Sequence, residues 1–273
     1  MKRINEPAGD TGFPVYQCRL PVSRRTNEYC TDLLSRHLKK IGSRWRALPP
    51  GRIVIIMLAV LRHDQRTADM AGGNAVGDTT VRRWRDELIS LLAARAPRLD
   101  RACKKIAKRC GEVVLIDGTL IPTVRRIGAA NRPNYSGRHR RHGLHFLALT
   151  HKNGRLIWIS AARPGRTHDI TAARRDHILT HLRAAGLGFL GLTDDSDDPV
   201  IVTGYKATRA RKLTPGEKQA NRVLAAAHAP VEHGFAHLKT WRILTKLRTD
   251  PAHATDSCAL SGSFRTSSSH ADR

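Results

Sequence analysis

Residues 111–122 (GEVVLIDGTLIP) place one carboxylate, Asp117, directly after four apolar residues. The apolar run predicts a buried strand, and a carboxylate at the end of such a strand costs free energy unless a partner compensates its charge. A divalent cation is an economical partner, because magnesium prefers oxygen ligands and binds one or two carboxylates together with substrate phosphates. Asp117 is therefore the first candidate metal ligand.

A second acid lies on a helix predicted after Pro230. The apolar positions of that helix are Val231, Phe235, Leu238 and Trp241. Glu232 stands at the edge of this apolar stripe, and Lys239 follows two turns later on the same face. An acid and a lysine so placed could hold a metal ion and a phosphate together. A surface ion pair is the commoner explanation for one Glu/Lys pair, and it stays open here.

Residues 125–143 (RRIGAANRPNYSGRHRRHG) contain six arginines, two histidines, one tyrosine and no acid. Arginine forks bind phosphates through two parallel hydrogen bonds, and a tyrosine ring can stack on an exposed base. The segment therefore predicts contacts to a nucleic-acid backbone, with Arg138, Arg140 and Arg141 as candidates. His139 and His142 have no acidic or cysteine neighbours in the sequence that would favour a metal site.

The whole chain is strongly basic, with 48 Lys and Arg against 23 Asp and Glu, a net charge of +25 and a pI of about 11.1. A twofold excess favours a polyanionic partner, with nucleic acid as the default. An arginine-rich solubilising surface would explain a milder bias. No apolar run reaches membrane-spanning length, the first ten residues lack a signal sequence, and the five cysteines form no CxxC pair. We expect a cytoplasmic protein, nucleoid-associated when bound to DNA, with no membrane partner.

Four helical segments are predicted within residues 27–100, after a flexible lead-in at 1–26. A helix starts at Asn27, an apolar helix covers 53–61, and a short helix at 66–70 meets a glycine-rich turn. Asp78 is a suitable N-cap for the next helix. This order is the outline of a helix-turn-helix, and it places Arg82 and Arg83 where they would enter a DNA groove. Many helical pairs share the outline.

The periodicity changes at residue 111, where we predict an α/β domain with a mixed sheet over residues 111–250. A strand at 113–117 precedes a hairpin around Asn153-Gly154, a helix at 167–186, a strand in 199–205 and two helices on either side of Pro230. Residues 255–273 contain six serines and no apolar period, which predicts a disordered or degenerate tail.

Four segments together resemble the DDE transposases of bacterial insertion sequences, in particular the insertion-sequence-five type related to the Harbinger transposases. They read VVLIDGT, NYSGRHRRHGLHFLALTHKNGRLIWISAARPGRTHDITAAR, TGYKA and APVEHGFAHLKTWRIL. The resemblance runs from about Leu48 to about Arg248. It implies an RNase H-like mixed sheet flanked by helices, preceded by an all-α helix-turn-helix region. It also implies two divalent metal ions, Mg²⁺ or Mn²⁺, held by an acidic triad.

The same resemblance implies roles for individual residues. Asp117 matches the first acid, Glu232 the third, and Lys239 a phosphate-contacting lysine. The second acid usually stands two residues before Gly-Tyr, where this chain has Val202. Asp169 is the preferred substitute, with a helix N-terminal acid as its alternative role. The other candidates form an acidic run that precedes its predicted strand: Asp194, Asp195, Asp197 and Asp198.

Two functions follow from the resemblance. The first is a metal-dependent transposase that hydrolyses phosphodiesters and transfers strands at insertion-sequence ends, with transposon ends and target DNA as partners. The alternative is a catalytically inactive, truncated relic that only binds DNA, which Val202 and the serine-rich tail favour. A structured-RNA-binding protein is a third hypothesis, supported by charge alone. Whether the chain forms a homodimer stays open.

Overall fold

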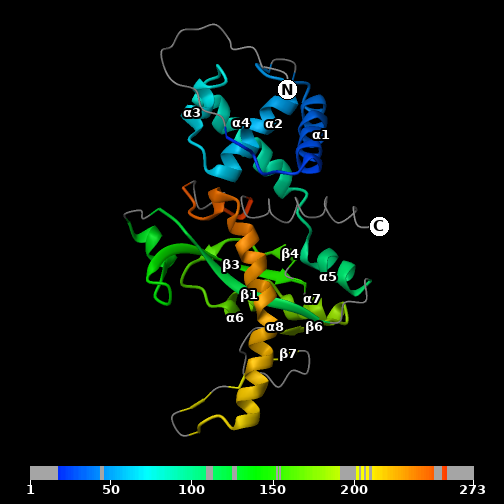
Figure 1. The fold of residues 1–273 in the computed structure, drawn as a ribbon, viewed down its shortest axis with the longest axis vertical. Coiled ribbons are helices and arrows are strands. Elements are labelled where there is room, and N and C mark those ends of the chain that lie inside the picture. Colours follow the sequence, from blue (N-terminus) through cyan, green and yellow to red (C-terminus); the bar gives the residue numbers. More distant parts are fainter. Residues whose placement is uncertain are drawn as a thin grey trace.

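A computed structural model describes residues 18–43, 46–108, 113–124, 128–151, 153, 155–190, 201–202, 204–205, 207–208, 211–248 and 254–256. The fold is a mixed α/β fold (Figure 1). The described helices are α1 (Arg24–Lys40), α2 (Pro50–His63), α3 (Thr67–Gly72), α4 (Asp78–Ala93), α5 (Leu99–Ala107), α6 (Asp169–Arg175), α7 (Ile178–Ala184) and α8 (Pro215–Lys239). Two short 3-10 turns accompany them, η1 (Ala129–Asn134) and η2 (Arg242–Leu244).

The strands form one mixed sheet. They are β1 (Val113–Pro122), β2 (Tyr135–Ser136), β3 (Arg141–Thr150), β4 (Leu156–Ile159), β5 (Arg163–Pro164), β6 (Gly188–Leu190) and β7 (Ile201–Val202). β3 pairs antiparallel with β1 on one side and with β4 and β5 on the other. β6 pairs parallel with β1, and β7 pairs parallel with β6. The sheet therefore runs β4-β3-β1-β6-β7.

Side-chain alternation along β1 divides the core between the two faces of the sheet. Leu115 and Ile121 join the cluster that contains Phe235 of α8 and the buried residues of α1, α2 and α4. Val114 and Ile116 point the other way, into the cluster built by α5, α6 and α7. α8 thus covers one face, and the α5–α7 group covers the other (Figure 1).

The helical region follows the predicted pattern, with two differences. The spacing of Leu33, Leu34, Leu38 and Ile41 predicts one apolar face for the first helix; the first three are buried, but Ile41 caps α1 and is 51% exposed. The N-cap of α4 is Gly77 rather than Asp78, because Asp78 is already helical and its carboxylate pairs with Arg82 one turn later at 2.8 Å. Gly77 supplies the extended backbone at the helix start.

Three elements around the sheet differ from the sequence prediction. The helix expected over 167–186 is interrupted at His177, whose φ of 51° is left-handed, so α6 and α7 are separate. β6 was not predicted, because its three residues are too short to show a period. The two helices expected around Pro230 are one continuous helix, α8, whose start is fixed by a capping box of Thr214 and Glu217.

The helical region and the sheet meet at the C-terminal end of α8. The guanidinium of Arg62, in the last turn of α2, lies 5.3 Å from the centre of the Trp241 ring and donates to Thr240 Oγ1 at 2.5 Å. Arg248 pairs with Asp64 at 3.1 Å. These polar contacts border the apolar cluster shared by α1, α2, α4 and η2. In Figure 1, α1–α4 accordingly gather beyond that end of α8.

Part of the predicted lead-in and most of the predicted tail lie outside the described residues. Residues 254–256 are helical, Ala254 is fully buried, and the Thr255 hydroxyl accepts a hydrogen bond from the Ala162 N–H at 3.0 Å. The start of the serine-rich segment is therefore packed against the strand region. Among the described helices, none is long and apolar enough to cross a membrane.

Candidate active site

Asp117 lies in the middle of β1 instead of at its end, because the strand continues to Pro122 alongside β3. The prediction that the strand ends at Asp117 is therefore wrong. Asp117 is paired with Ala148 of β3, and on its other side the last described pair between β1 and β6 is Leu115–Leu190.

The backbone N–H of Gly118 points to the side of β1 that is opposite to β3. In an antiparallel ladder, hydrogen-bonded pairs alternate with pairs whose N–H and C=O groups point outward. The Thr123 N–H donates to the His142 C=O at 3.1 Å, so the residues of β1 that lie two, four and six positions before Thr123 are also in hydrogen-bonded pairs. Gly118 lies five positions before Thr123 and is therefore in a pair whose groups point outward. Its N–H points away from β3 and donates to Asp117 Oδ1 at 2.8 Å. One oxygen of the carboxylate is oriented by this bond.

Glu232 belongs to the same face of the sheet as the Asp117 side chain. Asp117 alternates with Leu115 and Ile121, which pack in the cluster that contains Phe235 of α8. Glu232 precedes Phe235 by three positions, so it lies nearly one turn earlier on the same side of the helix, and it is exposed. Lys239, the last residue of α8, is exposed as well.

Asp169 lies on the opposite face. It is the first residue of α6, and α6 packs in the cluster formed by Val114 and Ile116. Its Oδ1 lies 2.5 Å from Nε2 of the buried His145, and both atoms occupy the space beside Gly118. The structure thus brings Asp169 next to the backbone of β1, but it does not bring the carboxylate to the face of Asp117 and Glu232.

The charge of Asp169 is stabilised where it lies. Burial alone raises the pKa of its carboxyl, but the hydrogen bond from His145 and the positive charges of His145, Arg138 and His168 outweigh it, so the pKa lies below its usual range. Arg138 Nη1 is 3.9 Å from Asp169 Oδ2. The carboxylate is therefore ionised at neutral pH and already has cationic neighbours.

Val202 is not beside Asp117 either. It ends β7, which pairs with β6 and not with β1, so β6 separates it from Asp117. The acidic run at 194–198 precedes β7, as predicted, but it also follows β6, the strand next to β1. Asp194, Asp195, Asp197 and Asp198 themselves lie outside the described residues.

The comparisons with known proteins address the region that holds these residues. The family model described as DDE superfamily endonuclease matches residues 116–260, more than half of the chain. The chain belongs to the DDE superfamily endonucleases. No curated protein and no solved structure matches it.

In this endonuclease the predicted DNA contacts fall into two groups. Arg138 and Arg140 are exposed in the turn between β2 and β3, and Arg141 is the exposed first residue of β3. Arg82 and Arg83 are exposed on α4, but the charge of Arg82 is partly compensated by Asp78. The cations near Asp169 and those on α4 thus belong to separate parts of the fold.

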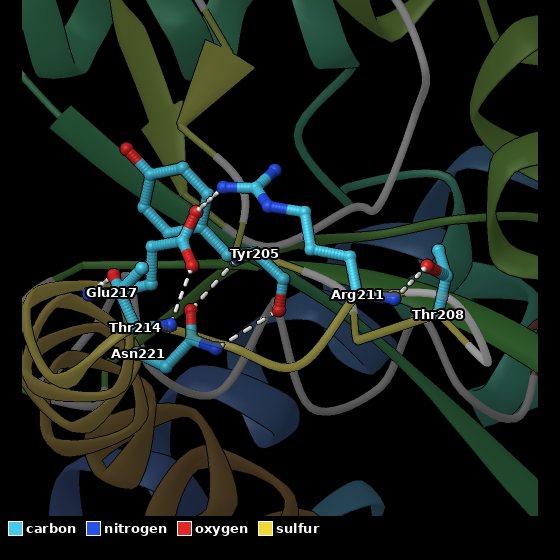
Figure 2. Close-up of polar contacts among 6 residues, drawn as sticks. All are labelled: Tyr205, Thr208, Arg211, Thr214, Glu217 and Asn221. Carbon is cyan, nitrogen blue, oxygen red and sulfur yellow. Dashed lines mark hydrogen bonds and ion pairs between the residues drawn. The ribbon is translucent and has the colours of Figure 1, made fainter.

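Sequence reasoning missed a clamp at the start of α8 (Figure 2). The Asn221 side chain accepts from the Tyr205 N–H at 2.8 Å and donates to the Tyr205 C=O at 2.9 Å. Glu217 accepts from the Thr214 N–H at 2.8 Å and pairs with Arg211. The sequence TPGE carries the signal of the capping box, whereas no local pattern marks Asn221 as the partner of Tyr205.

The other missed residue is His145, which reads in the sequence as one polar residue within an apolar strand. Its side chain is 8% exposed and bonds to Asp169, 24 positions away. Asp117 and Glu232 carry carboxylate oxygens, the type of donor that magnesium prefers. Within the described ranges, no three His, Cys, Asp or Glu side chains form a group that could hold a metal ion.

Proposed function

We propose that this endonuclease cleaves DNA phosphodiesters with the help of divalent metal ions and transfers the cut strands at insertion-sequence ends. One observation carries the proposal. Asp117, with one carboxylate oxygen oriented by the Gly118 N–H, lies on the face of the sheet that is covered by α8, the helix that carries Glu232.

Asp117 and Glu232 would hold the metal ions from β1 and α8. When bound, Mg²⁺ or Mn²⁺ supplies activation of the attacking water or 3′-hydroxyl and stabilises the charge that develops on the phosphate. The Gly118 N–H bonds to Asp117 Oδ1 and so fixes the orientation of the carboxylate that would bind a cation. Lys239 lies seven positions after Glu232, two turns along α8, where an ammonium can contact a phosphate of the same strand.

The sheet supports an RNase H-like arrangement. β1, β3 and β4 form an antiparallel meander, and β6 and β7 are added parallel to β1. The parallel strands β1 and β6 are therefore direct neighbours. Ligands of open α/β sheets bind at the carboxyl ends of such strands, where neighbouring connections leave in opposite directions. In this chain Asp117 lies two positions beyond the last described pair of β1 and β6.

DNA would contact two basic surfaces. The exposed arginines of the turn before β3 would hold the backbone near the cleavage site, because guanidinium groups pair with phosphate oxygens. The pair α3–α4, a short helix and a longer one joined by a glycine-rich turn, would act as the helix-turn-helix, with Arg83 at the exposed start of α4. Both contacts predict binding that weakens steeply with salt.

One observation favours the alternative of a relic that binds DNA without cutting it. The position that the resemblance assigned to the second acid is Val202, and β6 separates it from Asp117. If residues 191–200 supply no carboxylate near Asp117, the pair of metal ions lacks a ligand and the chain only binds DNA.

A cleavage assay separates the two. Purified protein is incubated with a supercoiled plasmid carrying its element ends, with Mg²⁺, Mn²⁺ or EDTA. We expect metal-dependent nicking that drops at least about 10³-fold in Asp117→Asn and Glu232→Gln. Glu28→Gln, an exposed acid on α1, is the matched control and keeps its activity. Nicking that survives Asp117→Asn rules out the site, and tight binding without nicking supports the relic.

A further inference from the structure

A histidine–aspartate pair fills the space behind Asp117. His145 of β3 and Asp169 of α6 meet with Nε2 and Oδ1 2.5 Å apart, and their side chains are 8% and 27% exposed. The other ring nitrogen of His145, Nδ1, is buried without a hydrogen-bond partner among the described residues. Nε2 is therefore the ring nitrogen through which His145 donates a hydrogen bond to Asp169.

Gly118 is the residue that makes room for this pair. A Cβ at position 118 would lie 2.0 Å from Asp169 Oδ1 and 2.6 Å from His145 Nε2, well inside van der Waals contact. Gly118 sits in an extended strand, so its lack of a side chain serves the close approach of the pair rather than an unusual backbone angle. The pair in turn packs directly against the backbone of Gly118.

That backbone orients Asp117. The Gly118 N–H that donates to Asp117 Oδ1 at 2.8 Å belongs to the residue against which the pair packs. Among the described residues, Asp169 and His145 supply the three heavy atoms nearest to the open side of Gly118. Their packing from behind therefore constrains the position of the peptide that orients the carboxylate.

We propose that His145 and Asp169 are positioning residues for Asp117, acting through Gly118, and that Asp169 is not a metal ligand. Asp169 also lies 3.9 Å from Arg138, so the same carboxylate holds one arginine of the basic turn near the site. The effect on cleavage rests on the proposed function. The effect on the Gly118 peptide does not, because it is a property of the folded chain alone.

The first arm of the test measures the peptide. Amide exchange of ¹⁵N-labelled protein is followed at Gly118 and along β3. His145→Leu and Gly118→Ala should raise the exchange rate of the amide at position 118 by about tenfold or more relative to the amides of β3, as expected when a supporting hydrogen bond is lost. Leu182→Ala, a buried change in the same core cluster, is the stability control and should leave that ratio unchanged.

The second arm measures cleavage. Loss of an outer hydrogen-bond partner costs about 10- to 100-fold in activity, so kcat in His145→Leu should fall by that range while KM for DNA stays within about twofold. His145→Gln keeps an N–H donor near the place of Nε2, and Asp169→Asn keeps an acceptor oxygen. Both conservative variants should restore most of the Gly118 protection and most of the lost rate.

Each outcome decides something. If Asp169→Asn is as inactive as Asp117→Asn while Gly118 stays protected, Asp169 is a ligand and the proposal is overturned. If His145→Leu leaves the Gly118 exchange ratio unchanged, the positioning role is overturned as well. If the wild-type chain cuts nothing, the proposed function fails, and the exchange arm alone still supports or rejects the positioning pair.

Discussion

The shared apolar core predicts that the helical region opens together with η2. Leu244 of η2 is 1% exposed and belongs to the cluster that contains Cys30 of α1. Leu244→Ala removes buried methyl groups and leaves a cavity, which costs about 3 kcal/mol for a leucine buried this deeply. If both regions unfold as one unit, the opening of α1 becomes more frequent by the same free energy.

Cysteine labelling measures this opening directly. Burial raises the pKa of the Cys30 thiol to about 12, so the native thiol is both covered and protonated and reacts only when the structure opens. Since about 1.4 kcal/mol is a factor of ten, 3 kcal/mol predicts roughly 100-fold faster labelling of Cys30 in Leu244→Ala. Peptide mass spectrometry separates Cys30 from the other thiols.

Two controls and one outcome complete the test. Cys18 is exposed and should label at the same rate in both proteins. Val223→Ala, at a position of α8 that is 61% exposed, should leave Cys30 labelling within about threefold of the wild type. Unchanged Cys30 labelling in Leu244→Ala would refute the reasoning, because it would mean that α1 opens without breaking contact to η2.

Further predictions concern charge, the clamp and the second core cluster. The pKa of the Asp169 carboxyl is lowered in the folded state, so its contribution to the free energy of unfolding is full above the unfolded pKa and is lost as pH falls through the folded pKa. Asp169→Asn should therefore reduce the decrease of the urea midpoint at acidic pH. Asn221→Ala removes two hydrogen bonds to Tyr205 and should cost about 1–2 kcal/mol by urea titration while raising local exchange at Tyr205; an unchanged exchange rate argues against the clamp. Burial, and secondarily the charge of Asp100, raise the pKa of Cys103 to about 11, so this thiol should resist iodoacetamide until denaturant is added.

Much of the fold was predictable from periodicity. Leu33, Leu34 and Leu38 mark the buried face of α1, and the hairpin of β3 and β4 closes around Asn153 as the turn residues indicated. The elements that periodicity missed are those decided by a few residues. β6 has three residues, and the break between α6 and α7 depends on His177, which has a left-handed conformation and follows Asp176, the partly buried partner of Arg163.

The site was predictable in part for the same reason. Asp117 was identified as a candidate by its place after an apolar run, and Glu232 by its place next to an apolar helical stripe. Neither signal depends on which strands are neighbours. The role of His145, in contrast, can be recognised only from the packing of the fold, because its partner Asp169 lies 24 positions away on the helix that covers β3 from behind. A local pattern has no access to such a pair.

The second carboxylate shows how strand order decides chemistry. In the parallel ladder Leu115 lies beside Leu190, and Leu190 beside Val202. β6 therefore lies between β1 and Val202, the position that spacing to the Gly-Tyr motif selects. The acidic run at 194–198 lies between β6 and β7 in the sequence, outside the described residues, and it contains the remaining candidates for the second acid. Replacing Asp194, Asp195, Asp197 and Asp198 by asparagine one at a time in the cleavage assay tests whether this site retains a complete set of ligands. A large loss of nicking in one variant identifies the ligand, and wild-type nicking in all four means that the ligand comes from elsewhere. Absence of nicking by the unsubstituted chain favours the DNA-binding relic.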